Sequence, residues 1–328
     1  MHAPKPQVLP DHTSPRGRTH KRSGNTDVSR SKALLLLAAL TLVWGFNFPV
    51  MKIALGEVPI WWFRSACVIF GGVGLLSISA AGGARILPRG RDVPALLVTA
   101  VFAIMCWQIF TGYGLLNMPA GRASIIAYTM PLWAAMYASF IGSEQITGTK
   151  LIGLALGLAG LIVLIGPDII VLQAAPIGAF CMFVASLSWA FGTVLVKHFR
   201  WSMPVGVMTG WMLLIGSVPI TIGAFLFQPF PDLNTFGTHV WLALAYVFLL
   251  PMIFGQWAFY SIVHHFSATV AGISTMAVPV VGILASALLL GETIGIQDVA
   301  ALVCICGALF SVLVAPALWP RRKDTKQT

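Results

Sequence analysis

Two short stretches of the chain share one pattern. Trp44 to Lys52 read WGFNFPVMK, and Trp189 to Lys197 read WAFGTVLVK. Trp, Phe and Lys recur at the same three places, 145 positions apart. Recurrence at so long a period predicts that the fold contains two copies of one structural unit.

Composition predicts the environment of these two copies. Of the 328 residues, 58% are apolar and only 9% are charged, whereas a soluble domain carries about 25% charged residues. So few charges predict an all-α integral membrane protein, in which a helix needs about 20 mostly apolar residues to cross the hydrocarbon core. Apolar runs between polar or Gly/Pro breaks predict ten transmembrane helices, at 33–55, 60–80, 93–116, 122–142, 150–167, 176–197, 204–227, 239–261, 269–290 and 298–318.

The basic residues predict how these helices are oriented. Ten spans place both termini on one side of the membrane. If that side is the cytoplasm, all 20 basic residues lie there except Lys52, Arg64 and Arg122, as the positive-inside rule requires. We therefore expect a disordered basic cytoplasmic tail over 1–32 and a second basic tail over 317–328. The net charge of +10 then marks topology and contact with the lipid bilayer, with no nucleic-acid partner.

The internal repeat extends well beyond the opening pattern. A shift of 148 positions aligns further pairs, among them Pro131 with Pro279, Glu144 with Glu292 and Gln108 with Gln256. The chain is therefore predicted to be two five-helix repeats, at 33–166 and 176–316. Because five is odd, the second repeat must be inverted. Inverted halves in secondary transporters meet around a site near the bilayer midplane; the alternative is a duplication retained for packing alone.

Several motifs stand in a fixed order along the two repeats. WGFNFPVMK lies near the start of the first span, Phe63-Arg64 enter the second, and the helices of Pro131 and Pro279 are followed by acidic loops, GSEQIT and GETIG. From Ala33 to Pro316 the chain resembles the EamA-type transporters of the drug/metabolite transporter superfamily. The resemblance implies a ten-helix carrier of small organic solutes in a bacterial inner membrane, commonly an exporter of amino acids and other metabolites.

Polar and helix-breaking residues at membrane depth are the candidates for a substrate site. A glutamine amide is costly to leave facing lipid and offers both donors and acceptors. A proline removes a backbone hydrogen bond and kinks its helix, and the freed carbonyl is tolerated beside protein or a water-filled cavity. The predicted cavity residues are Trp44, Asn47, Arg64, Gln108, Tyr128, Pro131, Trp189, Gln256, Trp257, Tyr260, Ser274 and Pro279.

Charged residues near the ends of the spans have more than one interpretation. Arg64 either binds a substrate carboxylate with its two-pronged guanidinium, or it extends to the head groups or makes a structural bond. The second interpretation, head groups or a structural bond, is favoured. Lys52 and Lys197 are expected to be interfacial anchors. None of the ten acidic residues falls at mid-membrane, where many ion-coupled carriers place a carboxylate. We expect facilitated diffusion or exchange as readily as proton antiport.

The same residues argue against other classes of protein. No nucleophile, base and metal-ligand set converges in the sequence, so we predict no enzyme, no catalytic residue, no metal and no cofactor. The five cysteines lie in apolar runs and are interpreted as small apolar side chains. The expected partners are a small-molecule substrate and lipid, with the chain a monomer or a homodimer. Alternative cargoes are phosphorylated or nucleotide-linked sugars and drug-like amines.

Overall fold

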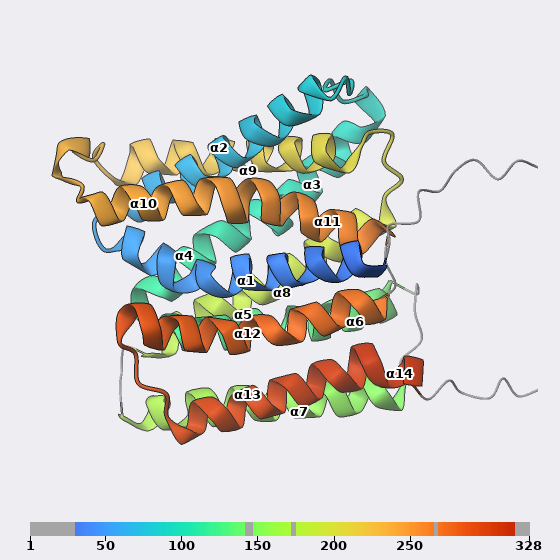
Figure 1. Cartoon of the computed structure of the whole chain (residues 1–328), viewed down its shortest axis with the longest axis vertical. Coiled ribbons are helices and arrows are strands. Elements are labelled where there is room, and N and C mark those ends of the chain that lie inside the picture. Colours follow the sequence, from blue (N-terminus) through green and yellow to red (C-terminus); the bar gives the residue numbers. More distant parts are fainter. Residues whose placement is uncertain (1–29, 142–146, 172–174, 266–267, 319–328) are drawn as a thin grey trace, which may run out of the picture.

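The structure, a computed structural model, describes residues 30–141, 147–171, 175–265 and 268–318, with most of their side chains. Every regular element in this part of the chain is a helix, and no strand occurs in it. The helices run side by side in one bundle (Figure 1). The first helix begins and the last helix ends at the same end of this bundle, on the right in Figure 1.

The helices of the first half follow one another through short connections. They are α1 (Arg30–Leu55), α2 (Ile60–Ala81), the short η1 (Gly90–Asp92), α3 (Val93–Ala100), the π-helical segment η2 (Val101–Cys106), α4 (Trp107–Asn117), α5 (Ala120–Ala127), α6 (Met130–Phe140) and α7 (Gly148–Val171).

The second half repeats this order. It comprises α8 (Ala175–His198), α9 (Val205–Phe227), the short η3 (Leu233–Thr235), α10 (Thr238–Val247), the π-helical segment η4 (Phe248–Gly255), α11 (Gln256–His265), α12 (Ala268–Leu290), α13 (Ile296–Leu309), the π-helical segment η5 (Phe310–Val314) and α14 (Ala315–Leu318).

Length and hydropathy make this bundle a membrane protein with several spans. Within the described residues, six continuous helical runs are long and apolar enough to cross a bilayer: Leu35–Leu55, Ile60–Ala81, Gly90–Asn117, Ile177–His198, Val205–Phe227 and Thr238–Ile262. Shorter apolar helices occupy Gly148–Gly160, Ala277–Leu290 and Ile296–Leu309. Large apolar side chains such as Phe140, Phe225 and Leu288 lie exposed on the outside, where lipid rather than water would stabilise them.

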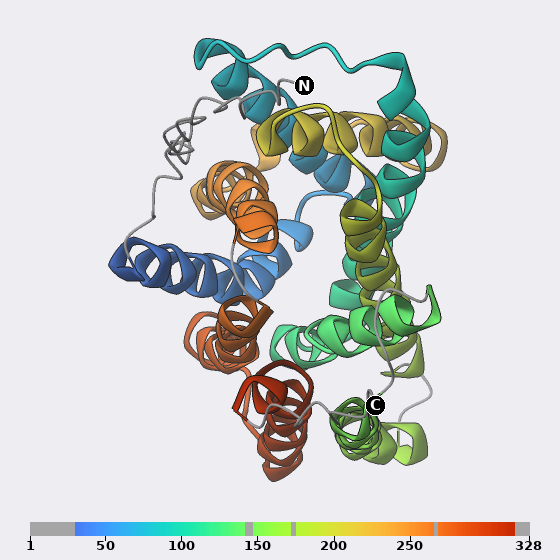
Figure 2. The same ribbon diagram turned by 90° about the vertical axis from the view of Figure 1, so that its right-hand side faces the viewer.

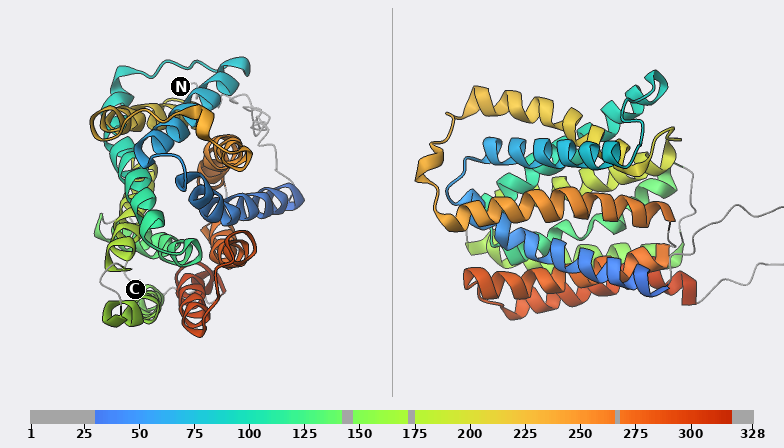
Figure 3. Two further views of the ribbon diagram at one scale, coloured as in Figure 1. Left: turned by 90° about the vertical axis from the view of Figure 1, so that its left-hand side faces the viewer. Right: turned by 45° about the horizontal axis from the view of Figure 1, so that its top comes forward.

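The most extensive helix packing joins the two halves of the chain. α2 packs along α9, α7 along α13, α1 along α12, and both α4 and α6 along α8. α7 and α13 lie together at one end of the long axis and α2 and α9 at the other (Figures 1 and 2). The two views of Figure 3 show the same interleaving of early and late segments. Short connections predict that sequence neighbours pack together, but this is wrong for α1, which packs on α12 and α10 far more than on α2.

Glycines explain why these pairs approach so closely. A Cβ added to Gly72 of α2 would lie 3.0 Å from the carbonyl oxygen of Gly210, and one added to Gly210 of α9 would lie 3.2 Å from that of Gly72. Each helix therefore rests directly on the backbone of the other. Gly45 of α1 is similarly covered by Val281 and Gly282 of α12. Small residues allow such contacts between membrane helices.

Besides η5 near the end of the described chain, helical regularity breaks at η2, at η4 and before Pro131. The segments η2 and η4 occupy matching positions in the two halves, and Gln108 and Gln256 follow them directly, as the second residue of α4 and the first of α11. Sequence reasoning did not predict these π-helical segments. Just before Pro131 the helix is interrupted, because α5 ends at Ala127 and α6 begins at Met130. In the second half, α12 continues through Pro279. The two proline helices are therefore not interrupted alike.

Candidate functional site

An aromatic cluster lies where α1, α4, α8 and α11 meet. The ring of Trp189 lies 6.1 Å from Trp44, 4.8 Å from Trp107, 5.6 Å from Phe259 and 6.3 Å from Tyr260, measured between centroids. Trp44 also packs on Phe259 at 5.1 Å. Pairs at these separations gain from ring electrostatics as well as from burial. Four helices from both halves therefore contribute to one buried group, which we call the aromatic cluster.

A buried arginine lies close to this cluster, at the junction of α2 with α1, α4 and η4. Arg64 is 1% exposed. Its Nη1 donates to Oε1 of Gln108 at 3.0 Å and to the sulfur of Met51 at 3.1 Å, and Nε2 of Gln108 donates to the sulfur of Met252 at 3.4 Å. We call these four residues the arginine centre. Of the two favoured expectations for Arg64, extension to the head groups is wrong, because the surrounding helices enclose its side chain, whereas a structural bond is present, to Gln108.

Several buried polar atoms around these two groups have no hydrogen-bond partner. Buried polar groups in proteins are nearly always paired, so each such atom indicates unused binding capacity. Asn47 lies one helical turn before Met51, and Gln256 lies one turn after Met252. The unpaired atoms in the described part of the chain are Oδ1 of Asn47, Nε and Nη2 of Arg64, Nε1 of Trp189, Oγ1 of Thr193, Oγ1 of Thr209, Oε1 of Gln256 and the Tyr260 hydroxyl.

The structure thus brings part of the predicted cavity set together. Trp44, Trp189 and Tyr260 share the aromatic cluster, and Arg64 and Gln108 are hydrogen-bonded. Asn47 and Gln256 contribute one unpaired oxygen each. The other five predicted residues belong to neither group.

Tyr128 is the nearest of these remaining residues in the first half. It is buried in the turn between α5 and α6, with its ring 6.2 Å from Phe48, the residue after Asn47. Pro131 is half-buried in the first turn of α6. Neither residue belongs to the aromatic cluster.

In the second half, the predicted residues diverge. Trp257 is 42% exposed and its ring pairs with Phe254, so it faces outward from the bundle. Pro279 is buried within α12. Ser274 belongs to α12, and its side chain lies outside the described residues.

Sequence reasoning missed the two methionines of the arginine centre and Phe259 of the aromatic cluster. A methionine in an apolar helix is normally core, so it carried no signal alone. The spacing of the two methionines did carry a signal. Met51 lies four residues after Asn47, and Met252 lies four residues before Gln256, so each pair shares one helix face.

A second polar group closes one end of the bundle. Gly291, with φ of 66°, ends α12 and turns the chain toward α5. Glu292 then accepts hydrogen bonds from the backbone N–H groups of Ala120 at 2.7 Å and Gly121 at 3.0 Å. A carboxylate at this position complements the positive end of the α5 dipole. The ammonium of Lys52 lies 3.5 Å from the same carboxylate and donates to the carbonyl of Met118 at 2.7 Å.

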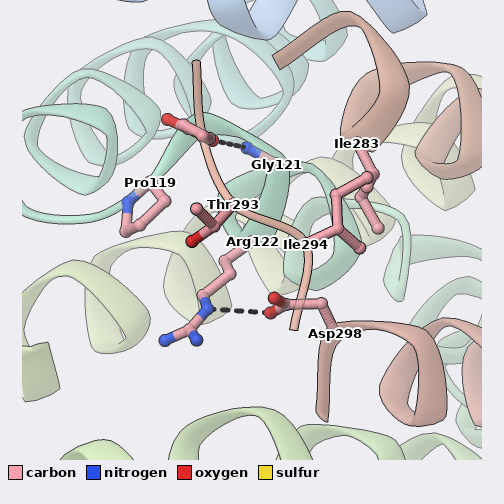
Figure 4. Close-up of a pocket in the computed structure, with 8 residues that line it drawn as sticks. Pro119, Gly121, Arg122, Ile283, Thr293, Ile294 and Asp298 are labelled. Carbon is pink, nitrogen blue, oxygen red and sulfur yellow. Dashed lines mark hydrogen bonds and ion pairs between the residues drawn. The ribbon is translucent and has the colours of Figure 1, made fainter. Parts of the chain in front are cut away.

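An ion pair extends this group. Nε of Arg122 donates to Oδ1 of Asp298 at 2.8 Å, and the other oxygen of Asp298 accepts from the backbone of Gly295 at 2.8 Å. Figure 4 shows Arg122 pointing toward Asp298. Around these contacts is an open pocket of about 290 Å³, lined by Pro119, Gly121, Arg122, Ile283, Glu292, Thr293, Ile294 and Asp298.

These contacts, which we call the Glu292 network, connect α1 and α5 of the first half to the α12–α13 loop of the second. Lys52 was expected to anchor the chain at the membrane interface. Its ammonium, in a side chain that is 33% exposed, bridges the two halves, and its place at the membrane interface stays a prediction.

Comparisons with known proteins agree with this arrangement. The EamA-like transporter family matches the chain twice, at residues 31–166 and 176–314. The chain is 25% identical over 280 residues to the uncharacterized transporter YoaV of Bacillus subtilis, covering 85% of this chain and 96% of that protein. It is 28% identical over 298 residues to the uncharacterized inner membrane transporter YedA of Escherichia coli K12, covering 87% and 92% of the two chains.

Two further similarities concern function and fold. A probable amino-acid metabolite efflux pump of Escherichia coli K12 is 26% identical over 296 residues, covering 87% of this chain and 96% of that protein. A solved crystal structure superposes with a TM-score of 0.67 at 19% identity, covering 88% of this chain and 99% of the other, which shows a shared fold. The family and these named relatives are transporters rather than enzymes. The chain belongs to the EamA-like transporter family of the drug/metabolite transporter superfamily.

Proposed function

We propose that this protein is a secondary transporter that moves small organic solutes, amino acids or related metabolites, across the inner membrane by alternating access. Ten transmembrane helices, arranged as two inverted five-helix repeats, carry out this exchange. The observation that carries the proposal is the matched pair of glutamines, Gln108 and Gln256, each buried directly after a π-helical segment in its own half.

The packing pattern supports the inverted repeat. The sequence correspondence relates α1 to α8, α2 to α9, α5–α6 to α12 and α7 to α13. Under this exchange the pairs α2 with α9 and α7 with α13 map onto themselves, and the pair α1 with α12 maps onto α8 with α5–α6. All of these pairs are packed. Such self-consistency is what a two-fold axis in the membrane plane produces.

The Glu292 network supports alternation between two states. It ties the halves together at one end, so its contacts must break before that end opens. The sequence places counterparts of its key residues at the opposite end: Lys197 ends α8 as Lys52 nearly ends α1, and Glu144 aligns with Glu292. Glu144 itself lies outside the described residues. The lysine and the glutamate of the network thus have sequence counterparts, whereas Arg122 and Asp298 align with Val270 and Lys150. We infer that each end closes when the other opens.

The chemistry of the candidate site supports the substrate class. Aromatic faces and amide groups together suit small solutes with an apolar side chain and a few hydrogen-bonding groups. Two relatives are named amino-acid metabolite efflux pumps, so export is the proposed direction. By the positive-inside rule both termini face the cytoplasm.

Reconstitution into proteoliposomes tests this proposal. Radiolabelled amino acids with aromatic, branched and hydroxylated side chains are supplied with and without a pH gradient. Saturable flux of at least one class is expected, and its response to the gradient reports coupling. A well-folded protein that moves none of these amino acids would contradict the proposed substrate class.

Replacing Gln256 by alanine is expected to reduce this flux at least about tenfold, since the unpaired Oε1 of Gln256 is a buried acceptor beside the aromatic cluster. Gln228→Ala is the matched control, because Gln228 accepts from the backbone of Trp61 at the end of α9, away from that cluster. Equal fluxes for the two variants, at equal expression, would remove Gln256 from the site.

A further inference from the structure

Arg64 is a buried cation without a buried anion. Its guanidinium cannot lose its charge under ordinary conditions, and an unpaired charge of this kind costs several kcal/mol in a low-dielectric interior. Its partners are neutral: Gln108 and Met51 accept hydrogen bonds, and the ring of Phe63 lies 5.2 Å from the guanidinium carbon. Among the described residues no carboxylate pairs with it: the acidic groups in ion pairs are Glu57, Glu292 and Asp298, and these pair with other cations. A charge kept under such conditions inside a membrane protein indicates a functional group.

The unpaired edge of the guanidinium has the geometry of a carboxylate site. The two nitrogens without partners are Nε and Nη2. Their N–H bonds point in parallel from one side of the planar group, and this edge binds the two oxygens of a carboxylate simultaneously. Nη1, on the other side, is held by Gln108 and Met51, which fixes the direction of the free edge.

A glycine borders this free edge. A Cβ added to Gly112 of α4 would lie 3.0 Å from Nε of Arg64. The same Cβ would also lie 2.6 and 2.9 Å from the side chain of Ile60, so any side chain at that position would crowd both Ile60 and the nitrogen that a carboxylate needs. Two acceptors lie four residues from the methionines of the arginine centre: Oδ1 of Asn47 and Oε1 of Gln256 are buried without donors. The faces of aromatic rings such as Trp44 and Trp189 attract cations. An ammonium group matches these acceptors, as a carboxylate matches Arg64.

We propose that Arg64 is the specificity-determining residue of the transporter and binds the carboxylate of its substrate side-on through Nε and Nη2. The inference rests on the proposed transport function and narrows it to solutes that carry a carboxylate. Amines and amides of the same shape leave the Arg64 charge uncompensated and are therefore poor substrates.

A matched set of compounds tests this inference. L-phenylalanine, L-phenylalaninamide, phenethylamine and 3-phenylpropionate share a side chain and differ in their charged groups, and the leucine series gives the same comparison. Binding to the purified full-length protein and flux in proteoliposomes are both measured. We expect the two carboxylates to bind at least about tenfold more tightly than the amide and the amine.

Variants locate this preference. Arg64→Gln is expected to reduce the ratio of acid to amide affinity to about one, whereas Arg64→Lys retains part of it because lysine keeps the charge without the fork. Gly112→Ala is also expected to bring the ratio of acid to amide affinity to about one, although Arg64 is unchanged in this variant. Arg91→Gln, at an exposed arginine of η1, is the control and should retain it. Melting temperature and gel filtration report folding for each variant.

The outcomes separate this inference from the transport function. If amides or amines move as well as the acids in the wild-type protein, the role of Arg64 is wrong and transport stands. If no compound of either series binds or moves, the proposed amino-acid transport fails and the inference fails with it. If Arg64→Gln does not fold, the wild-type ratio and Gly112→Ala still decide.

Discussion

An alanine at Gly192 is expected to destabilise the protein by about 3 kcal/mol, at the upper end of what overpacking normally costs. Gly192 of α8 lies against η2, and an added Cβ would come within 2.5 Å of Cβ, 2.6 Å of the backbone N and 2.7 Å of Cα of Ala103. Two of these are main-chain atoms, so a change of rotamer provides no relief. The helix α8 must move away from η2, and with it Trp189 from Trp107.

Thermal unfolding in detergent measures this effect, with Gly307→Ala as the matched control. Gly307 is also inside a helix, α13, but an added Cβ there meets only Cδ1 of Leu156, at 3.6 Å, an ordinary contact. The control should unfold at or above the wild-type temperature, because alanine favours a helix over glycine. If both variants unfold at one temperature, α8 and η2 are not as close as the structure places them.

Glu292→Gln is expected to weaken the closed end of the bundle by about 2 kcal/mol, or roughly thirtyfold in the equilibrium between closed and open. The substitution keeps the size of the side chain but removes the charge that faces two backbone N–H groups and Lys52. The Glu292 carboxylate side chain is only 18% exposed, so solvent screens these contacts little. Breaking them uncouples α5 from the α12–α13 loop.

Hydrogen–deuterium exchange checks this prediction in peptides that contain residues 119–127 and 291–298. Exchange should accelerate in both. Glu57→Gln is the control, since Glu57 lies at the same end and also links distant segments, through His239 at 2.8 Å and Gly237 at 3.1 Å. That pair is far more exposed, and exposed ion pairs contribute little. Equal exchange in the two variants would contradict a closing role for Glu292.

The sequence predicted the helical segments closely because lipid imposes one simple rule. A span must be apolar over its whole length, so its ends are visible as the first polar or helix-breaking residues. The predicted 60–80 and 204–227 correspond to Ile60–Ala81 and Val205–Phe227. The π-helical segments were not predicted, because their backbone irregularity leaves no mark on hydropathy.

The direction in which each side chain points could not be predicted in the same way. In a soluble helix, polar residues mark the outer face, but lipid and protein core are both apolar, so this signal disappears. Trp107 comes just before Gln108 and Trp257 just after Gln256, and hydropathy does not distinguish the one that packs on Trp189 from the one that is exposed. The enclosure of Arg64 could not be predicted for a related reason, because the residues around it include Gln108 of α4 and, beyond that glutamine, Met252 of η4, far away in the sequence.

The interleaved halves have a consequence for how the protein is made. When residues 31–166 have been synthesised, the helices against which α1, α2 and α7 pack do not yet exist, because α9, α12 and α13 all follow Val205. The first half therefore enters the membrane with Arg64 already inserted and its glycine surfaces uncovered, and native contacts form only late in translation. A chain that stops after the first repeat therefore lacks the helices that cover α1, α2 and α7, and we expect it not to form a stable domain.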